Sequence, residues 1–120
     1  MQTQELGNAI VRLCEERRGI EAVSRFYAND VISNEAPGTA VELRSEGKAS
    51  VLAKNQWWYE NHEIHELTAR GPFSGANDQF AILFEIDVTQ SGSGERIRIS
   101  EVGVYKARDG QIVEETFLYG

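Results

Sequence analysis

The period at which apolar side chains recur changes about halfway along the chain, and this change constrains the fold more than any other feature. In the first half, Leu6, Ile10, Leu13 and Cys14 recur at the spacing of one helix face. In the second half, apolar and polar residues alternate, as in strands with one buried face. Helices followed by such strands indicate an α+β domain with its helices on one face of an antiparallel sheet.

The helical half predicts three helices and two short strands. Thr3 is the expected N-cap of the first helix, and Gly19 is expected to break it. Asn29-Asp30 should end a second helix, and Ala36-Pro37-Gly38-Thr39 should form a turn. The other expected elements are the second helix itself at about 22–27, a third helix from about 46 to 61, and short strands at 31–35 and 40–43.

The alternating half predicts four strands joined by tight turns. Asp109-Gly110 and Ser91-Gly92-Ser93-Gly94 lie between apolar runs, where such residues favour hairpin turns. A chain of 120 residues is long enough to close one hydrophobic core. We therefore expect a single domain over residues 1–120, with strands at 64–73, 79–89, 95–107 and 112–119.

Composition argues against several classes of protein. The formal net charge is −7 and the basic residues are scattered, whereas a nucleic-acid binder presents a basic face to phosphates. No apolar run approaches the roughly 18 residues of a membrane span, and the first residues do not resemble a secretory signal. Cys14 is the one cysteine, so no disulfide can form within the chain. These features predict a cytoplasmic protein without a nucleic-acid or membrane partner.

Four segments carry a resemblance to a known family: 26–31, Gly47-Lys48-Ala49, Gly71-Pro72-Phe73 and 104–115. In this order and spacing they resemble the nuclear transport factor 2-like superfamily, most closely its SnoaL-like, or polyketide cyclase-like, branch. The resemblance covers nearly the whole chain. It implies a cone-shaped fold with a strongly curved antiparallel sheet, three helices on the concave face, and a pocket for a small, mostly apolar molecule.

Glu35 is the first candidate for chemistry. In the similar ketosteroid isomerases a matching segment carries an aspartate general base, and aligning residues 26–30 with that segment places Glu35 there without a gap. A carboxylate at the mouth of a pocket can remove a proton next to a carbonyl group. The alternative interpretation is a solvated turn residue beside Pro37-Gly38.

Glu101 is the second candidate, because it alternates with Ile97, Ile99 and Tyr105 on one predicted strand face. A carboxylate among apolar neighbours needs either a partner or a proton. A protonated acid in such a place can donate a hydrogen bond to a developing oxyanion, as in ketosteroid isomerase, and related isomerases carry an acid on this strand. The alternative is a structural carboxylate bonded to a histidine or a tyrosine.

Glu85 and Asp87 should share one face of a strand. The related limonene epoxide hydrolases place a catalytic aspartate on about this strand, beside an arginine. No arginine flanks the pair in this sequence, and residues 117–120 lack the acid that those enzymes carry at the end of the final strand. Both departures argue against epoxide hydrolysis.

His62 and His65 are the two histidines of the chain. On a strand their spacing of three points them to opposite faces, whereas zinc requires three or four converging ligands. We therefore expect neither a metal nor a cofactor. His65 is the better candidate for an inward acid/base group or an orienting partner of a carboxylate. A hydrogen-bonded structural histidine is the alternative.

Aromatic side chains supply the expected walls of the pocket. Trp57 and Trp58 are adjacent on the third predicted helix, where successive residues lie about 100° apart, so both cannot face inward equally. Aromatic residues suit an apolar ligand site, but a core of this size also needs them. The expected pocket-lining residues are Tyr27, Trp57, Trp58, Phe84 and Tyr105.

The leading functional hypothesis is a cofactor-free acid/base enzyme for a small, ring-like carbonyl compound, acting by isomerisation, cyclisation or dehydration. Glu35 would remove the proton, and Glu101 or His65 would stabilise the oxyanion. Val11 stands where ketosteroid isomerases carry a tyrosine donor, so steroid isomerisation is not expected. The alternatives are a non-catalytic ligand-binding module and a domain used mainly for dimerisation.

Apolar residues on the second face of the sheet predict a homodimer. Val102 and Val104 lie opposite the face that carries Tyr105, and Leu83 lies opposite the face that carries Phe84. A sheet that is apolar on both faces must be covered on both. We therefore expect two copies of the chain to pair through the sheet.

Overall fold

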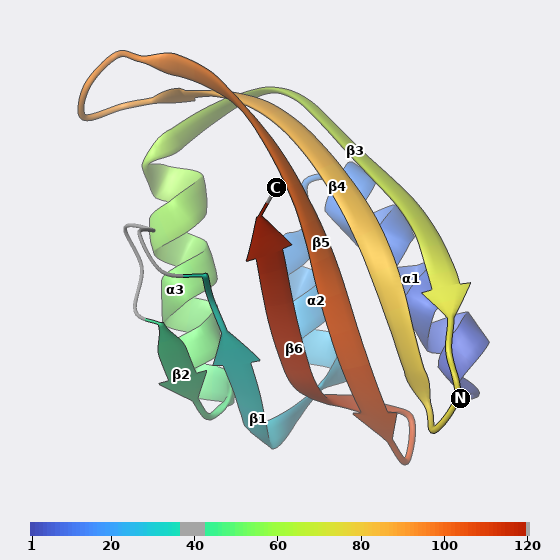
Figure 1. The fold of residues 1–120 in the computed structure, drawn as a ribbon. Helices are drawn as coiled ribbons and strands as arrows, with labels where there is room; N and C mark the ends of the chain where they lie inside the picture. Colours follow the sequence, from blue (N-terminus) through green and yellow to red (C-terminus); the bar gives the residue numbers. More distant parts are fainter. Residues whose placement is uncertain (37–42, 120) are drawn as a thin grey trace.

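Residues 1–36 and 43–119, the part of the chain that the computed structural model describes, form three helices and six strands (Figure 1). This arrangement confirms the predicted α+β class. In chain order the elements are α1 (Thr3–Glu15), α2 (Gly19–Phe26), β1 (Tyr27–Asn34), β2 (Arg44–Glu46), α3 (Lys48–Glu60), β3 (His62–Ser74), β4 (Gln79–Gln90), β5 (Arg96–Arg108) and β6 (Gln111–Tyr119). No helix in these ranges is both long and apolar enough to cross a bilayer.

The described strands form one sheet in the order β2-β1-β6-β5-β4-β3. Neighbouring strands are antiparallel except β1 and β6, which run parallel, so the sheet is mixed rather than wholly antiparallel as predicted. Hairpin signals determine only the strands that they connect. The β1–β6 pair joins Ser33 to Glu115, which lie 82 residues apart, so no local signal specifies its direction.

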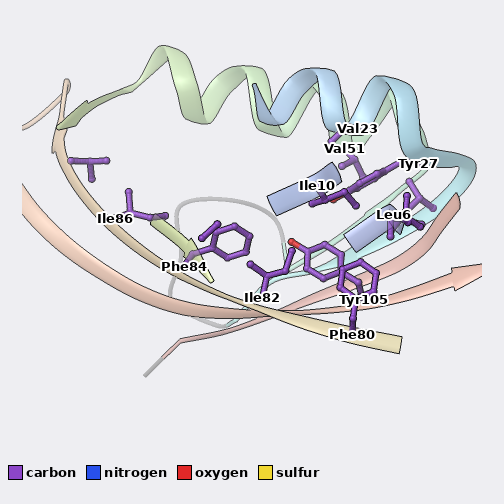
Figure 2. Packing of buried hydrophobic residues seen from close by; sticks show 14 residues of the cluster. Leu6, Ile10, Val23, Tyr27, Val51, Phe80, Ile82, Phe84, Ile86 and Tyr105 are labelled. Atoms are coloured by element: carbon purple, nitrogen blue, oxygen red, sulfur yellow. The ribbon is translucent and has the colours of Figure 1, made fainter. Parts of the chain in front are cut away.

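The sheet curves around the helices, and all three helices lie on its concave side as predicted (Figures 1 and 2). The core fills the space between them. Figure 2 shows apolar side chains of the helices facing those of the sheet. The helices contribute Leu6, Ile10, Val23 and Val51, and the strands contribute Tyr27, Phe80, Ile82, Phe84, Ile86 and Tyr105, all buried.

The first two helices differ from prediction at their ends. Thr3 lies inside α1, where its hydroxyl bonds the Asp78 carboxylate at 3.1 Å, and Gln2 occupies the N-cap position instead. Gly19 begins α2. It packs so closely against Tyr59 that a Cβ at this position would lie 2.6 Å from the Tyr59 hydroxyl oxygen. Tyr27 begins β1, so α2 ends before the predicted stop at Asn29-Asp30.

Helix α3 lies over the part of the sheet formed by β1 and β2, with further contacts to β3. Val51 is buried, and Lys54 and Trp58, one and two turns further on, are partly buried. These positions recur at i, i+3 and i+7, the spacing of one helix face. An inward lysine interrupts the apolar pattern, so the sequence does not identify this face.

The four strands predicted in the second half are confirmed to within two residues at each end. Between α2 and α3, β1 covers most of the predicted strand at 31–35, and β2 begins at Arg44. The predicted strand at 40–43 and the turn Ala36-Pro37-Gly38-Thr39 fall largely on residues 37–42, which lie outside the described residues.

Candidate active site

The concave side of the sheet and the three helices enclose a cavity of about 150 Å³. One wall is apolar, and the other end gathers charged and hydroxyl groups. The apolar wall includes Val23, Leu67, Phe84, Ile86, Ile99 and Phe117, whereas the polar end is formed by Glu35, Lys54, Glu101, Glu115 and Tyr119. An apolar chamber with a few convergent polar groups is the usual form of a small-molecule site.

Glu35 is held from two sides at the polar end. The Lys54 ammonium donates to Oε1 at 3.0 Å, and the Tyr119 hydroxyl donates to Oε2 at 2.9 Å. The Glu35 side chain is only 7% exposed. Hydrogen bonds that involve charged groups are stronger than neutral ones, so both oxygens of this carboxylate are fixed in position.

Glu115 forms a second, deeper group of hydrogen bonds. Tyr27 donates its hydroxyl to Oε1, and Ser33 donates to Oε2 at 2.7 Å. Ser33 in turn accepts from Lys54 at 2.5 Å, which connects Glu115 to Glu35. Burial raises the pKa of Glu115, and the charge of Lys54 and the two hydroxyl donors oppose that rise.

Glu101 lies on β5 and lines the cavity from the sheet, whereas Lys54 lines it from α3. Burial raises the pKa of Glu101 to about 7, the nearby carboxylates of Glu35 and Glu115 add to this rise, and a hydrogen bond with Tyr119 opposes it. Burial raises the pKa of Tyr119, and the carboxylates of Glu101 and Glu35 raise it further, so Tyr119 remains a neutral hydroxyl. At neutral pH Glu101 is therefore a mixture of acid and carboxylate.

The structure brings Glu35 and Glu101 together around Tyr119, but it places His65 elsewhere. His65 is exposed and its Nε2 lies 2.7 Å from the Thr89 hydroxyl, so it neither lines the cavity nor partners Glu101. The reason is a β-bulge: Ile64 pairs with Val88 and Glu66 pairs with Asp87, so His65 is the extra residue. A bulge breaks the alternation on which the prediction depended.

His62 also lies outside the cavity lining. Its ring stacks on Trp58 with 4.6 Å between ring centroids, and its Nδ1 lies 2.8 Å from the Trp58 carbonyl oxygen. Among residues 1–36 and 43–119, no three His, Cys, Asp or Glu side chains converge on a position that could hold a metal. The described side chains thus offer a metal ion no ligand set.

Four of the five expected aromatic residues line the cavity: Tyr27, Trp58, Phe84 and Tyr105. Trp57 does not, because it is 40% exposed and packs edge-on against the ring of His62. The two tryptophans therefore divide as their 100° separation requires, with Trp58 on the inner face of α3.

Asp87 has arginines beside it in the sheet, although none flanks the Glu85–Asp87 pair in the sequence. Arg96 of β5 binds both carboxylate oxygens of Asp87 at 2.9 Å, and Arg98 lies 3.8 Å away, so the hydrogen bonds of Arg96 lower the pKa of Asp87. Arg98 pairs directly across from Asp87, and cross-strand neighbours are not adjacent in sequence. Asp87 alternates with the inward Ile86 and Val88 and lies outside the cavity, so this cluster has no part in the site.

Three residues of the polar end were not predicted: Lys54, Glu115 and Tyr119. Glu115, Phe117 and Tyr119 alternate along β6 and all line the cavity, so a period-two pattern could have identified them. Lys54 gave no such signal, because an inward lysine interrupts the apolar pattern of α3.

The family model for the SnoaL-like domain matches residues 1–119. The chain belongs to the SnoaL-like domain family. A crystal structure from Mesorhizobium loti, provisionally called a SnoaL-like polyketide cyclase, is 36% identical, with a TM-score of 0.91 over 99% of this chain and 100% of that one. No curated protein matches this SnoaL-like chain.

More distant structures share the SnoaL-like fold. A provisional isomerase from Bacillus subtilis is 19% identical, with a TM-score of 0.80 over 100% of this chain and 90% of that one. A protein from Catenulispora acidiphila with a ketosteroid isomerase-like fold, in complex with trimethylamine, is 10% identical, with a TM-score of 0.73 over 94% and 83% of the two chains. At these identities the likeness concerns the fold alone.

Proposed function

We propose that this SnoaL-like protein is a cofactor-independent acid/base enzyme that acts on a small, largely apolar carbonyl compound, as an isomerase, cyclase or dehydratase. One observation carries the proposal. Two carboxyl groups, Glu35 and Glu101, lie in one apolar cavity on either side of the Tyr119 hydroxyl, and their surroundings differ. Titratable groups whose environments favour opposite protonation states are typical of acid/base catalysis.

Glu35 is suited to act as the base. Its carboxylate, paired with Lys54, can accept a proton from the carbon next to a carbonyl group, so that the C–H electron pair moves into an enolate. The protonated Glu35 can return that proton to a different carbon, which completes an isomerisation. The enolate carbon can instead attack a second carbonyl group, whose oxygen then takes the proton from Glu35, which corresponds to cyclisation. In dehydration the enolate breaks the C–O bond of a β-hydroxyl group, which leaves as water with that proton.

Glu101 is suited to stabilise the oxyanion. With a pKa of about 7, a large fraction of Glu101 carries a proton at neutral pH and can donate a hydrogen bond to the enolate oxygen. Such a donor stabilises negative charge more strongly in an apolar cavity than in water. None of these steps moves electrons to or from an outside acceptor.

The dimensions of the cavity limit the substrate. A cavity of about 150 Å³ accommodates roughly one six-membered ring, since an engineered cavity of similar volume binds benzene. Most of the cavity wall is apolar and offers an anion no partner, which disfavours anionic ligands. We therefore propose a neutral compound of about one ring.

The test is proton exchange, which requires no knowledge of the natural reaction. Cyclohexanone and 2-cyclohexenone are incubated with the protein in D₂O, and loss of the proton next to the carbonyl is followed by NMR. We expect exchange above the buffer rate, and Glu35→Gln should lower it by about 10²- to 10⁴-fold, the range for a general base. The matched control is Glu95→Gln, an exposed hairpin residue outside the cavity, which should exchange at the unaltered rate.

Two results would count against the enzyme. Exchange equal to the buffer rate with every ring ketone that stabilises the protein in a thermal-shift screen would favour the non-catalytic ligand-binding module. Exchange that persists in Glu35→Gln would assign the base to another residue.

A further inference from the structure

Lys54 forms an unusual ion pair for this protein. Its side chain is 11% exposed, and the Glu35 and Glu115 side chains are 7% and 2% exposed. In every other ion pair found within residues 1–36 and 43–119, at least one side chain is about half exposed or more. Removing one charge from a buried pair leaves the other uncompensated, which is not so for a solvated pair.

The ammonium lies between two carboxylates but binds only one of them directly. Its Nζ is 3.0 Å from Oε1 of Glu35 and 4.0 Å from Oε2 of Glu115. The Ser33 hydroxyl accepts a hydrogen bond from Lys54 and donates one to Glu115. The charge of Lys54 therefore acts most strongly on Glu35.

Tyr119 contacts both cavity carboxyls and does not by itself make them unequal. Its hydroxyl donates to Oε2 of Glu35 at 2.9 Å. Its hydrogen bond with Glu101 lowers the pKa of that carboxyl, against the larger opposite effect of burial. The difference between the two carboxyls must therefore come from another group.

We propose that Lys54 is a positioning residue that keeps Glu35 ionised and so leaves the proton of this cluster on Glu101. The inference rests on the proposed function, in which Glu35 accepts a proton and Glu101 donates a hydrogen bond. Two carboxyls that share a site otherwise titrate as a pair, with one proton between them. Lys54 removes the equivalence of Glu35 and Glu101 because it binds Glu35 directly and acts on Glu101 only through its charge.

The other titratable groups around Glu101 do not supply this asymmetry. They are Cys14 of α1, Tyr27 of β1, Glu35 after β1, Tyr105 of β5, and Glu115 and Tyr119 of β6. Burial raises the pKa of Cys14 to about 12 and also raises the pKa of Tyr27 and of Tyr105, so these three are neutral at pH 7. Lys54 is therefore the only cation among the described residues that line the cavity.

The experiment is a pH titration of the glutamate carboxyl carbons by NMR, on protein labelled with ¹³C at those carbons. Glu35→Gln and Glu101→Gln assign the two signals. In the wild type we expect Glu101 to titrate near neutral pH while Glu35 remains ionised. In Lys54→Met we expect Glu35 to take up a proton near neutral pH, and Lys54→Arg should largely restore the wild-type behaviour because it restores the charge.

Lys48→Met is the matched control. Lys48 lies on the same helix and bonds the Ser24 carbonyl oxygen outside the cavity, so its loss should leave both titrations unchanged. If Glu35 titrates identically in Lys54→Met and in the wild type, the inference is wrong. If Lys54→Met does not fold, the wild type still decides, because a protonated Glu35 beside an ionised Glu101 at pH 6 would overturn the assignment.

The result of this titration can be distinguished from the result of the proton-exchange test of the proposed function. A Lys54-dependent titration without proton exchange on any ketone would support the role of Lys54 and reject the enzyme. The opposite result is also possible. If exchange depends on Glu35 but Lys54→Met leaves it unchanged, instead of reducing it at least about tenfold, the enzyme is supported and the role of Lys54 is rejected.

Discussion

Glu101 is a largely buried carboxyl group that forms no ion pair with any residue of the described ranges, and this has a measurable effect on stability. Its pKa rises from 4.5 to about 7 on folding. The folded chain therefore holds a proton that the unfolded chain has already released between these two values. The stabilisation associated with this proton is complete below pH 4.5 and is lost as the pH rises through about 7.

We therefore predict that Glu101→Gln alters the pH dependence of unfolding. Relative to the variant, the wild type should lose up to about 3 kcal/mol of unfolding free energy between pH 4.5 and pH 8. Urea unfolding of both proteins at several pH values measures the difference. A constant difference across this range would mean that Glu101 does not carry the raised pKa.

At the same scale, the sequence predicts some site residues and not others. Glu101 could be predicted because its neighbours Ile97 and Ile99 alternate with it on β5. His65 was misplaced because a bulge reverses the alternation of β3, and bulges leave little trace in a single sequence. Alternation along β6 places Tyr119 on the inward face, but its hydrogen bond to Glu35 depends on β6 lying next to β1 in the sheet, which no local pattern reports.

At the scale of elements, α3 lies on the border between the core and the cavity. Trp58 on its inner face lines the cavity, whereas the adjacent Trp57 is 40% exposed. Trp58 is therefore placed to contact a ligand in the cavity, whereas Trp57 is not.

We predict that Trp58→Ala enlarges the cavity and that Trp57→Ala does not. The first variant should be stabilised more strongly than the wild type by the two-ring ketone 2-tetralone, and less strongly by cyclohexanone, which it no longer packs against. Thermal-shift measurements with both ketones on the three proteins make the comparison. Equal responses of the two variants would remove Trp58 from the cavity wall.

The helices and strands themselves were largely predictable, since hydrophobic period and turn residues are local properties. The parallel pairing of β1 with β6 was not, because it depends on how the complete chain closes. The same holds for Lys54, whose inward position on α3 becomes intelligible only once Glu35 and Glu115 are placed opposite it.

At the scale of the whole molecule, the convex face of the sheet carries an apolar patch. Leu83, Val102 and Leu118 are direct neighbours across β4, β5 and β6, and Leu118 is 54% exposed. Val104 continues the patch along β5. Contiguous apolar surface of this kind favours association, so we retain the proposal that two copies pair through this face.

We predict that sedimentation at micromolar concentration gives the mass of a dimer, and that Val102→Lys with Leu118→Lys gives a monomer. A lysine pair at the centre of a symmetric interface would bury uncompensated charge. The cavity lies on the opposite face of the sheet, so ketone binding should survive the change. A monomeric wild type would reject the proposal.

The pairing of β1 with β6 also has a consequence for biosynthesis. During translation, Tyr27, Ser33 and Glu35 emerge well before Glu115 and Tyr119, the residues that complete their hydrogen bonds. Until β6 is made, β1 lacks its parallel neighbour, and the carboxylates and hydroxyls of the polar end have no common enclosure. A nascent chain can form its helices and the β3–β4 hairpin before β6 is made, but the site is incomplete until β6 pairs with β1 and β5.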